Sequence, residues 1–378
     1  MRLMEWLDAN YQIDDVGDVL TPALAIYPEH VDANIDATLR LMGGDADRWR
    51  PHVKTAKLGF VMARLAEHGA VNMKCSTTLE LATACEAGAR DVVVAYAMVG
   101  ANARRVREIA ASFPKVAISI LVENEEQAAS WHGSTIGIHI DVNSGMNRTG
   151  IDPARLDRIL SLARAAGGQF RGLHYYDGHV SATDFKERET AAHAGYIRLM
   201  EMVTAFESAG VPIPELITSG TPAFPYGLSF KPFSRGSFVH RVSPGTIVYH
   251  DFTSLSQLSE TYNYRPAALI LATVVSHPLP NIVTCDAGHK SVSADAGVPT
   301  CMVLGRPDLR PQKPSEEHLP IEVAAGAPIP RIGSTLYLLP RHICPSVNNF
   351  DEALIVERGR VSRLEPVSAR GHESPLAK

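Results

Sequence analysis

Short apolar runs rich in β-branched residues alternate with longer stretches rich in Ala, Leu, Arg and Glu up to about residue 250. Branched side chains pack well on a pleated sheet, so the apolar runs predict strands. These runs are LAIY (24–27), HVK (52–54), VNMKC (71–75), DVVVAYA (91–97), KVAISILV (115–122), TIGIHIDV (135–142), FRGLHYY (170–176), ELITS (215–219) and RVSPGTIVY (241–249). The stretches between them predict helices, many of which end in a capping glycine. They include 58–69, 78–88, 101–113, 153–167 and 186–210.

Regular alternation of strand and helix predicts βαβ units and therefore a parallel sheet. Eight such units fit a (β/α)8 barrel, and an open doubly wound sheet is the competing architecture. No GxGxxG opens a helix after the first strand, which weakens the dinucleotide-binding form of the open sheet. The pattern therefore favours the barrel.

The pattern changes after about residue 250, where proline becomes frequent and helical periodicity disappears. Short β-rich runs follow one another to about residue 366, which predicts a separate antiparallel β domain. The last residues, RGHESPLAK, predict a frayed end.

Composition and charge exclude several classes of function. The net charge is −5 and no Lys- or Arg-rich run occurs, so neither nucleic acid nor a membrane surface is an expected partner. No apolar run reaches about 18 residues, and the acidic start lacks the apolar core of a signal peptide. The five cysteines are scattered and odd in number, which favours a reduced, cytoplasmic protein over a disulfide framework.

Candidate chemistry collects where the predicted barrel strands end, the edge at which barrel active sites form. Lysine can form Schiff bases with carbonyl compounds, although most lysines are simply solvated. The loops TSGTP and SPGT offer backbone N–H groups to a phosphate, although each alone is more often a plain turn. Together these residues indicate pyridoxal 5′-phosphate. They are Lys54, Arg148, Tyr176, His179, Ser219, Gly220, Thr221, Gly245 and Thr246.

Five motifs resemble those of the D-threonine aldolase / D-serine dehydratase family, which belongs to the alanine-racemase-like pyridoxal-phosphate enzymes. They occur in the family's order between about residues 20 and 370, and are RPHVKTAK, DVNSGMNRTG, GLHYYDGH, ITSGT and PRHICPSVNNFDEALIV. The resemblance implies an α/β fold with an N-terminal (β/α)8 barrel of the alanine-racemase type plus a C-terminal antiparallel β domain. It also implies that residues 1–27 contribute a strand to the β domain, that 28–250 form the barrel and 251–378 the β domain, and that the enzyme is a homodimer.

The resemblance also implies roles for single residues. Lys54 matches the family's Schiff-base lysine, Arg148 the arginine that contacts the cofactor's phenolic oxygen, and Tyr176 the tyrosine that ends the seventh strand. The residues that match the phosphate loops are Ser219, Gly220, Thr221, Gly245 and Thr246. Lys57 reads as a helix-start lysine, and His52 either lies beside the cofactor ring or packs within its strand.

A second candidate site is the pair His342 and Cys344 in HIC. On a strand, side chains two residues apart project from one face. Without context this pair reads as an edge histidine beside a buried cysteine, whereas the resemblance implies a divalent-metal pair. A cysteine ligand favours Zn²⁺ over Mn²⁺ or Mg²⁺. Asp286, His289 and Lys290 lie in another shared segment and are candidates for supporting groups.

The reaction that the resemblance implies is retro-aldol cleavage of a D-β-hydroxy-α-amino acid, such as D-threonine, to glycine and an aldehyde. Aldolases of the family use a histidine just beyond the strand-seven tyrosine, but here Ala182 stands at that place and His179 is shifted in spacing. The alternative is a D-serine or D-hydroxyamino-acid dehydratase giving a 2-oxo acid and ammonia, towards which the His-x-Cys pair leans. A racemase without metal and a non-catalytic cofactor-binding protein are further alternatives.

Overall fold

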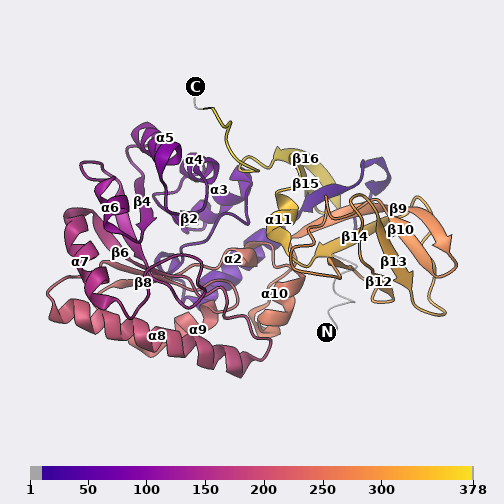
Figure 1. The fold of residues 1–378 in the computed structure, drawn as a ribbon. Helices are drawn as coiled ribbons and strands as arrows, with labels where there is room; N and C mark the ends of the chain where they lie inside the picture. The colour runs from indigo at the N-terminus through magenta and orange to yellow at the C-terminus, as the bar shows by residue number, and fades with distance from the viewer. Residues whose placement is uncertain (1–10, 377–378) are drawn as a thin grey trace. The chain divides into compact units, whose positions relative to one another are not determined.

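A computed structural model describes residues 11–376 of the chain, which Figure 1 traces as a ribbon. Contacts between residues divide the chain into two compact units. The first, which we call the β unit, contains the chain up to residue 37 together with 55–61 and 246–371. The second, which we call the barrel unit, contains 38–54, 62–245 and the residues from 372 onward.

The barrel unit is built on seven parallel strands that follow one another in chain order around the sheet. They are β2 (Asn72–Cys75), β3 (Asp91–Val94), β4 (Ala117–Val122), β5 (Gly137–Asp141), β6 (Phe170–Tyr175), β7 (Glu215–Thr218) and β8 (Val239–Val242). The helices along this part of the chain are α3 (Gly59–Glu67), α4 (Thr78–Glu86), α5 (Gly100–Ser112), α6 (Glu125–Ala129), α7 (Leu156–Ala166), α8 (Phe185–Ser208) and α9 (Phe224–Ser229). The parallel arrangement predicted from alternation is confirmed.

An extended segment, residues 49–53, occupies the eighth position of the ring. Trp49 pairs with Val242 of β8, and His52 pairs with Lys74 of β2. The N–H of Arg50 donates to the Val242 carbonyl at 2.9 Å. Both edges of the seven-stranded sheet therefore bond to the same segment, which closes the ring.

Two strand predictions in this unit need correction. HVK (52–54) forms an isolated bridge rather than a full strand. RVSPGTIVY (241–249) is a strand only to Val242, and Thr246–Val248 is a 3-10 helix. Pro244 explains the second break, because proline has no N–H with which to continue a ladder.

The interior of the barrel carries an ion-pair network rather than an apolar core alone. Arg50 is fully buried, and its guanidinium binds Glu215 through two bonds of 2.8 and 2.9 Å. A third bond of 2.9 Å reaches Asp91. Although burial alone would raise the pKa of Glu215, the Arg50 charge and the His139 hydrogen bond hold it well below its usual range. The carboxylate is therefore ionised inside the barrel.

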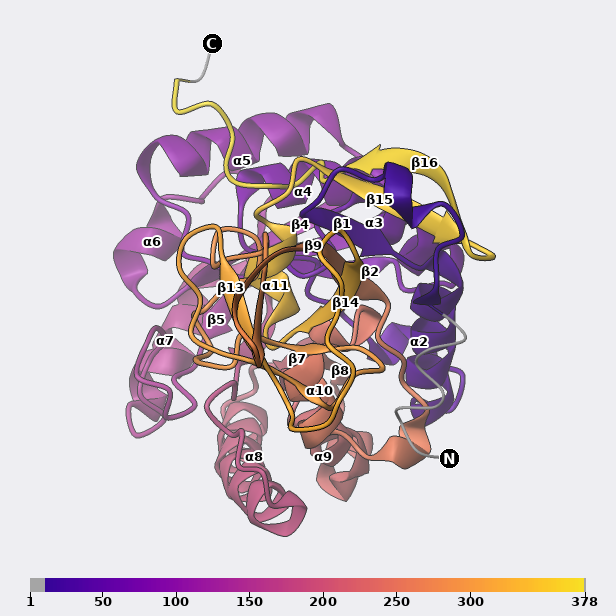
Figure 2. The same ribbon diagram turned by 90° about the vertical axis from the view of Figure 1, so that its right-hand side faces the viewer.

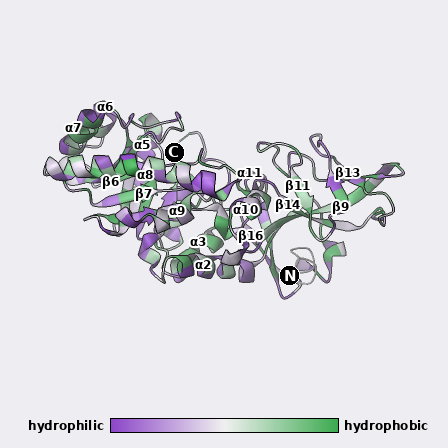
Figure 3. Cartoon of the chain, turned by 90° about the horizontal axis from the view of Figure 1, so that it is seen from below, coloured by the Kyte–Doolittle hydropathy of each residue, from purple (hydrophilic) through white to green (hydrophobic). Residues whose placement is uncertain are grey.

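Helix α8 shows how the helices of the barrel unit present one face to the interior. Its buried residues recur every three or four positions: Arg188, Ala192, Gly195, Tyr196, Leu199, Met202, Val203 and Phe206. Hydrophobic and hydrophilic residues consequently interleave along the helix (Figure 3). This spacing is that of an amphipathic helix. Within the described chain, no helix combines the length and apolarity that a bilayer crossing requires.

The β unit is built on a nine-stranded sheet, labelled in Figures 1 and 2. Its strands are β1 (Ala23–Ile26), β9 (Ala268–Leu279), β10 (Ile282–Cys285), β11 (Cys301–Val303), β12 (Leu309–Pro311), β13 (Leu319–Val323), β14 (Thr335–Pro340), β15 (Glu352–Glu357) and β16 (Arg360–Pro366). Strand β1 lies between β9 and β15 and is parallel only to β15. The helices of this unit include α2 (Pro28–Leu41), which its boundary divides, α10 (Phe252–Gln257) and α11 (Ile343–Val347). The predicted antiparallel β domain is confirmed.

Replacing Arg50 with Met should lower the free energy of unfolding by about 3–5 kcal/mol, because it leaves the Glu215 carboxylate buried without its main partner. Urea denaturation followed by circular dichroism measures this loss. Arg158→Met is the matched control, since Arg158 pairs with Glu125 on the surface, where such a pair contributes at most about 1 kcal/mol. Equal losses in the two variants would contradict the prediction.

Candidate functional site

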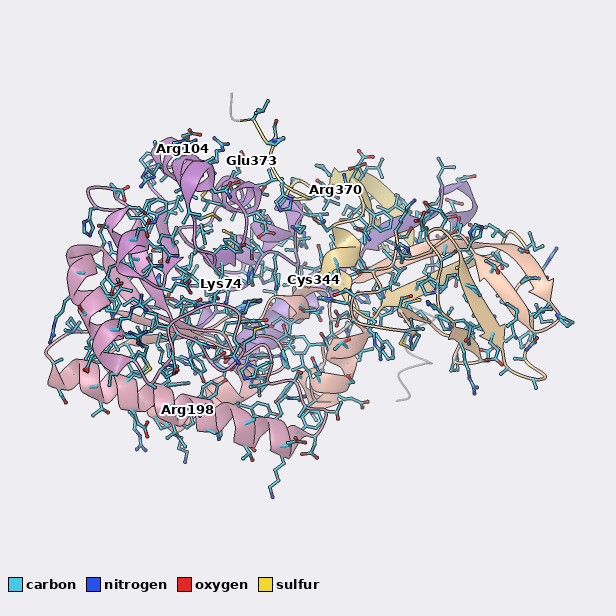
Figure 4. All side chains as sticks on the ribbon, viewed as in Figure 1. Lys74, Arg104, Arg198, Cys344, Arg370 and Glu373 are labelled. Carbon is cyan, nitrogen blue, oxygen red and sulfur yellow. The ribbon has the colours of Figure 1, made fainter. Side chains whose placement is uncertain are left out.

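A cavity of about 1160 Å³ lies in the barrel unit. Many of its lining residues come from the carboxyl ends of the strands or from the loops that follow them. The polar residues that matter here are Lys54, Lys74, Asp141, Arg148, His174 and Tyr176. Figure 4 labels Lys74 among the side chains inside this unit. In parallel α/β folds the carboxyl edge of the sheet is where active sites form, so this cavity is the candidate site.

Lys54 enters the cavity directly after the extended segment that closes the ring. Its backbone N–H donates to Nδ1 of His52 at 3.4 Å. His52 also lines the cavity, and its Nε2 lies 3.2 Å from the Ser76 hydroxyl. Lys57, by contrast, belongs to the β unit, where its ammonium donates to the Ala369 carbonyl at 3.1 Å. Lys54 rather than Lys57 is thus the lysine of this motif that faces the cavity.

The ring of Tyr176 lies close to two basic side chains. The guanidinium carbon of Arg148 is 5.3 Å from the ring centre, and Nζ of Lys74 is also 5.3 Å from it. Both distances fall within the range of cation–π attraction. Lys54, Arg148 and Tyr176, which three different motifs supply, therefore line one cavity.

A buried Lys–His–Asp series runs beside this tyrosine. Nζ of Lys74 lies 3.4 Å from Nε2 of His174, whose Nδ1 lies 2.7 Å from Oδ1 of Asp141. All three residues are at most 6% exposed. Burial, reinforced by the nearby Lys54 charge, lowers the pKa of Lys74 to about 7.

The sequence did not lead us to predict this series, although it contains one signal of it. Lys74 interrupts the apolar run VNMKC, and His174 and Asp141 stand in the equally buried strands GLHYY and GIHID. Charged residues are seldom buried unless they are paired. A lysine in a buried parallel strand therefore indicates polar partners on other strands of the barrel.

His179 does not line the cavity that contains Lys54. It lines a second cavity of the barrel unit, of about 360 Å³, together with Asp177, Ala182 and Arg198. A side-chain carbon added at Gly145 would lie 3.3 Å from Nε2 of His179, so the imidazole packs against the loop after β5. Figure 4 labels Arg198, which marks this second region.

The predicted phosphate loops also stand apart from the lining of the larger cavity. The N–H of Gly220 donates to Oδ1 of Asp177 at 3.1 Å, and the Ser219 hydroxyl lies 2.8 Å from that of Tyr196. Burial raises the pKa of Asp177. Of the described residues, the lining includes none of Ser219, Gly220, Thr221, Gly245 and Thr246.

Gly245 is nevertheless required where it stands. A Cβ there would lie 2.3 Å from the His52 carbonyl oxygen, so only glycine allows the two backbones to approach so closely. Thr246 belongs to the β unit, and its hydroxyl lies 3.6 Å from the Cys344 sulfur.

The end of the chain contributes to the wall of the cavity. Residues 372–376 line it, and the Glu373 carboxylate accepts hydrogen bonds from the Arg105 guanidinium, the shortest of 2.7 Å. Figure 4 labels Glu373. Arg105 lies on α5. The prediction of a frayed end is therefore wrong for this segment, while 377–378 lie outside the described residues.

The candidate metal pair lies in the β unit, at the start of a helix and not on a strand. Strand β14 ends at Pro340, His342 caps α11, and Cys344 lies in the first turn of that helix. The predicted strand arrangement is thus wrong, and Pro345 gives the reason, since proline fits the first turn of a helix. The two side chains still meet, because His342 hydrogen-bonds to Cys344.

The surroundings of this pair suit a metal ligand set. Nδ1 of His342 lies 2.6 Å from the Asp295 carboxylate, an arrangement that orients histidines bound to zinc. Burial lowers the pKa of His342, but Cys344 and Asp295 outweigh it and raise the pKa to about 9. The Cys344 sulfur lies 3.0 Å from the Thr55 hydroxyl. The described residues offer no group of three or more His, Cys, Asp or Glu for one ion, so a metal here would rely on other ligands as well.

The three candidate supporting residues have other contacts. Asp286 accepts hydrogen bonds from the Thr21 hydroxyl at 2.6 Å and from the Thr273 N–H at 2.7 Å, which ties it to the sheet. Lys290 is exposed and pairs with two surface glutamates. Among the contacts of the described residues, none joins Asp286, His289 or Lys290 to the His342–Cys344 pair.

Two family models match the chain. The model described as alanine racemase, N-terminal domain, matches residues 26–251, and the model described as putative serine dehydratase domain matches residues 267–356. The first match alone spans more than half of the chain.

Three curated relatives match almost the whole chain. A 3-hydroxy-D-aspartate aldolase of Paracoccus denitrificans is 28% identical, and the match covers 94% of each protein. A D-threonine aldolase of an Arthrobacter species is 29% identical, with 95% of this chain and 94% of that protein covered. A D-threo-3-hydroxyaspartate dehydratase of a Delftia species is 25% identical, with 87% and 92% covered.

Solved structures share the fold. The D-threonine aldolase from Filomicrobium marinum superposes with a TM-score of 0.85 at 24% identity, covering 94% of this chain and 97% of that one. A D-threo-3-hydroxyaspartate dehydratase with one cysteine replaced by alanine, described as metal-free, gives a TM-score of 0.80 at 20% identity and covers 96% and 100%. Another solved variant of that dehydratase replaces a histidine two positions before that cysteine.

Proposed function

Because the chain belongs to the family of the alanine racemase N-terminal domain, we propose that it is a lyase that uses pyridoxal phosphate and a divalent metal. Its substrate is a D-β-hydroxy-α-amino acid such as D-threonine, cleaved to glycine and an aldehyde. The observation that carries the proposal is the convergence of Lys54, Arg148 and Tyr176 on one cavity at the carboxyl edge of the sheet. The named aldolases among its relatives support the choice of reaction.

The residues of the barrel unit fit the cofactor. Lys54 offers the primary amine that binds it covalently, Arg148 a fixed positive charge for its phenolic oxygen, and Tyr176 a flat surface beside its ring. The predicted phosphate contacts are Ser219, Gly220, Thr221, Gly245 and Thr246. Pyridoxal phosphate, when bound, withdraws electrons from the substrate's Cα and so eases the breaking of bonds to that carbon.

The metal would be held by His342 and Cys344, with Asp295 orienting the imidazole. The sulfur ligand favours zinc, although manganese and magnesium remain alternatives for an oxygen-rich site. A divalent ion in this role polarises the substrate's β-hydroxyl as a Lewis acid. The solved dehydratase variants, which alter a histidine and a cysteine at the same spacing, support this assignment. From the family resemblance we also infer a cytoplasmic homodimer.

The alternative is a dehydratase that forms a 2-oxo acid and ammonia. It is favoured by the His-x-Cys pair and by the dehydratase among the relatives. The two reactions differ in the proton that a base removes, from the β-oxygen for cleavage and from Cα for dehydration. His179, which sequence analysis offered as the base for cleavage, lines the second cavity with Ala182, so its position gives that role no support.

Lys54→Ala should abolish cofactor binding, because the covalent anchor is lost. The measurement is visible absorbance after incubation with pyridoxal phosphate, followed by borohydride reduction and peptide mass spectrometry. Lys57→Ala, the matched control, should bind normally. A reduced adduct on Lys57 or Lys74 in the wild-type protein would contradict the assignment.

The double variant His342→Ala/Cys344→Ala should lose activity while it keeps the cofactor, because the predicted cofactor lysine and the metal pair belong to different units. Exhaustive chelation of the wild type should have the same effect, and added Zn²⁺ or Mn²⁺ should reverse it. Metal content by mass spectrometry and cofactor absorbance give the two readouts. Full turnover by the chelated double variant would refute the metal assignment.

Incubation with D-threonine and with D-serine tests the reaction itself. Cleavage of D-threonine gives glycine and acetaldehyde, whereas dehydration gives 2-oxobutyrate and ammonia, and D-serine would give pyruvate. We expect glycine and acetaldehyde from D-threonine, and no reaction with the L isomer as the control. Oxo acids and ammonia without glycine would establish the dehydratase instead.

A further inference from the structure

Lys74 is a lysine in the interior of the barrel. It stands on β2, is 1% exposed, and lines the same cavity as Lys54. A buried ammonium normally requires an anionic partner. Among the described residues no ion pair includes Lys74, and its hydrogen-bond partner is the imidazole of His174 at 3.4 Å. This is the environment of an amine that is not permanently charged.

The imidazole in turn is fixed by a carboxylate. Burial raises the pKa of Asp141, but the interactions with His174, Thr149 and Arg148 together outweigh burial and lower the pKa. Burial and the Lys74 charge lower the pKa of His174. Asp141 is therefore an ionised acceptor, so Nδ1 of neutral His174 donates to it at 2.7 Å. Nε2 is left as an acceptor for an N–H of Lys74, and the lone pair of the neutral amine stays available.

Charges of both signs surround Lys74. The groups that face it are Arg50 from the ring-closing segment, Lys54 directly after it, Asp141 from β5, and His174, Tyr176 and Asp177 from β6 and its end. Arg148, from the loop after β5, lines the same cavity. Lys54 and Arg50 disfavour the ammonium form, whereas Asp177 and Asp141 favour it. Their opposition, together with burial, places the pKa of Lys74 at about 7, where an acid–base group works best at neutral pH.

We propose that Lys74 is the acid–base residue that carries the substrate's proton, with His174 and Asp141 as positioning residues, an inference that rests on the proposed lyase function. The neutral amine takes the proton from the β-hydroxyl oxygen. The Cα–Cβ bond breaks, the oxygen's electrons form the aldehyde carbonyl, and the bonding pair leaves with Cα. The Lys74 ammonium then returns the proton to Cα, which completes glycine. No other reactant is needed.

The other candidate bases are less suited to this acid–base role. Lys54 is assigned to the cofactor, His179 lines the second cavity, and His52 already contacts the Ser76 hydroxyl and the Lys54 backbone. Lys74 is the remaining amine of the lining that the described residues provide. It also has the orienting partners that a general base requires.

Titration of the cofactor-free protein tests the ionisation without any turnover. In protein labelled with ¹³C at the lysine Cε, one lysine signal should titrate near pH 7 and be absent from Lys74→Met. Lys290→Met, the matched surface control, should keep it. Asp141→Asn should move that titration to lower pH, because removing a negative charge destabilises the ammonium. If every lysine titrates near its ordinary value of about 10, the inference is overturned.

Kinetics of the cofactor-loaded protein test the catalytic role. Lys74→Met should lower kcat by about 10²–10⁴-fold with cofactor absorbance retained. Ethylamine should restore part of the activity of Lys74→Ala, which it would not do for a residue that only fills space. Lys74→Arg should stay inactive, since a guanidinium does not release its proton.

The pH profile separates positioning from structure. Because kcat/KM needs the neutral amine, it should rise with pH through about 7 in the wild type. Asp141→Asn should lower it by about 10–100-fold and move the rise to lower pH. If the wild type turns over its substrate and Lys74→Met or Lys74→Arg is active as well, the role of Lys74 is overturned while the proposed lyase function stands. A wild type that neither binds pyridoxal phosphate nor turns over overturns the proposed function as well.

Discussion

The bidentate ion pair between Arg50 and Glu215 is the interaction on which the barrel unit depends. Arg50 belongs to the extended segment that closes the ring, and Glu215 belongs to β7. The segment has only isolated backbone bridges to its neighbours. The charge pair inside the ring therefore adds stabilisation that a longer ladder of backbone hydrogen bonds would otherwise provide. Because Lys54 follows this segment directly, the same pair helps to hold the backbone from which the candidate cofactor lysine enters the cavity. Arg50, the first residue of RPHVKTAK, thus affects both the stability of the barrel unit and the geometry of the candidate site.

Part of this site could be predicted from the sequence, because barrel chemistry follows strand ends. Lys54 and Tyr176 end predicted strands and Arg148 lies in the loop after one, and the structure brings all three to one cavity. Lys74, His174 and Asp141 could not be found in that way, since they stand within or at the last position of their strands. Asp141 and His174 meet through the register of β5 and β6, whereas Lys74 reaches His174 from β2, which does not neighbour β6 in the sheet. A one-dimensional pattern does not carry that information.

The errors at other positions have local causes. The run RVSPGTIVY (241–249) predicts one strand, but Pro244 ends the ladder and Thr246 starts a 3-10 helix. His342 and Cys344 were placed on one face of a strand, whereas Pro345 favours a helix start there. The pair still meets, because a cap residue and a first-turn residue are as close as strand residues two apart. Two residues at positions i and i+2 can therefore still meet at one site when the secondary structure predicted for them is wrong.

The interior charges also tie the function of Lys74 to the closure of the barrel. Arg50 is one of the cations that lower the pKa of Lys74, and Glu215 and Asp91 hold it in place. Removing the Arg50 charge would therefore raise the pKa of Lys74 and reduce the fraction of neutral amine at pH 7. An apolar side chain at position 50 would therefore change catalysis as well as stability. Arg50 thus affects both the stability of the barrel unit and the pKa of Lys74, so a substitution at this position changes both.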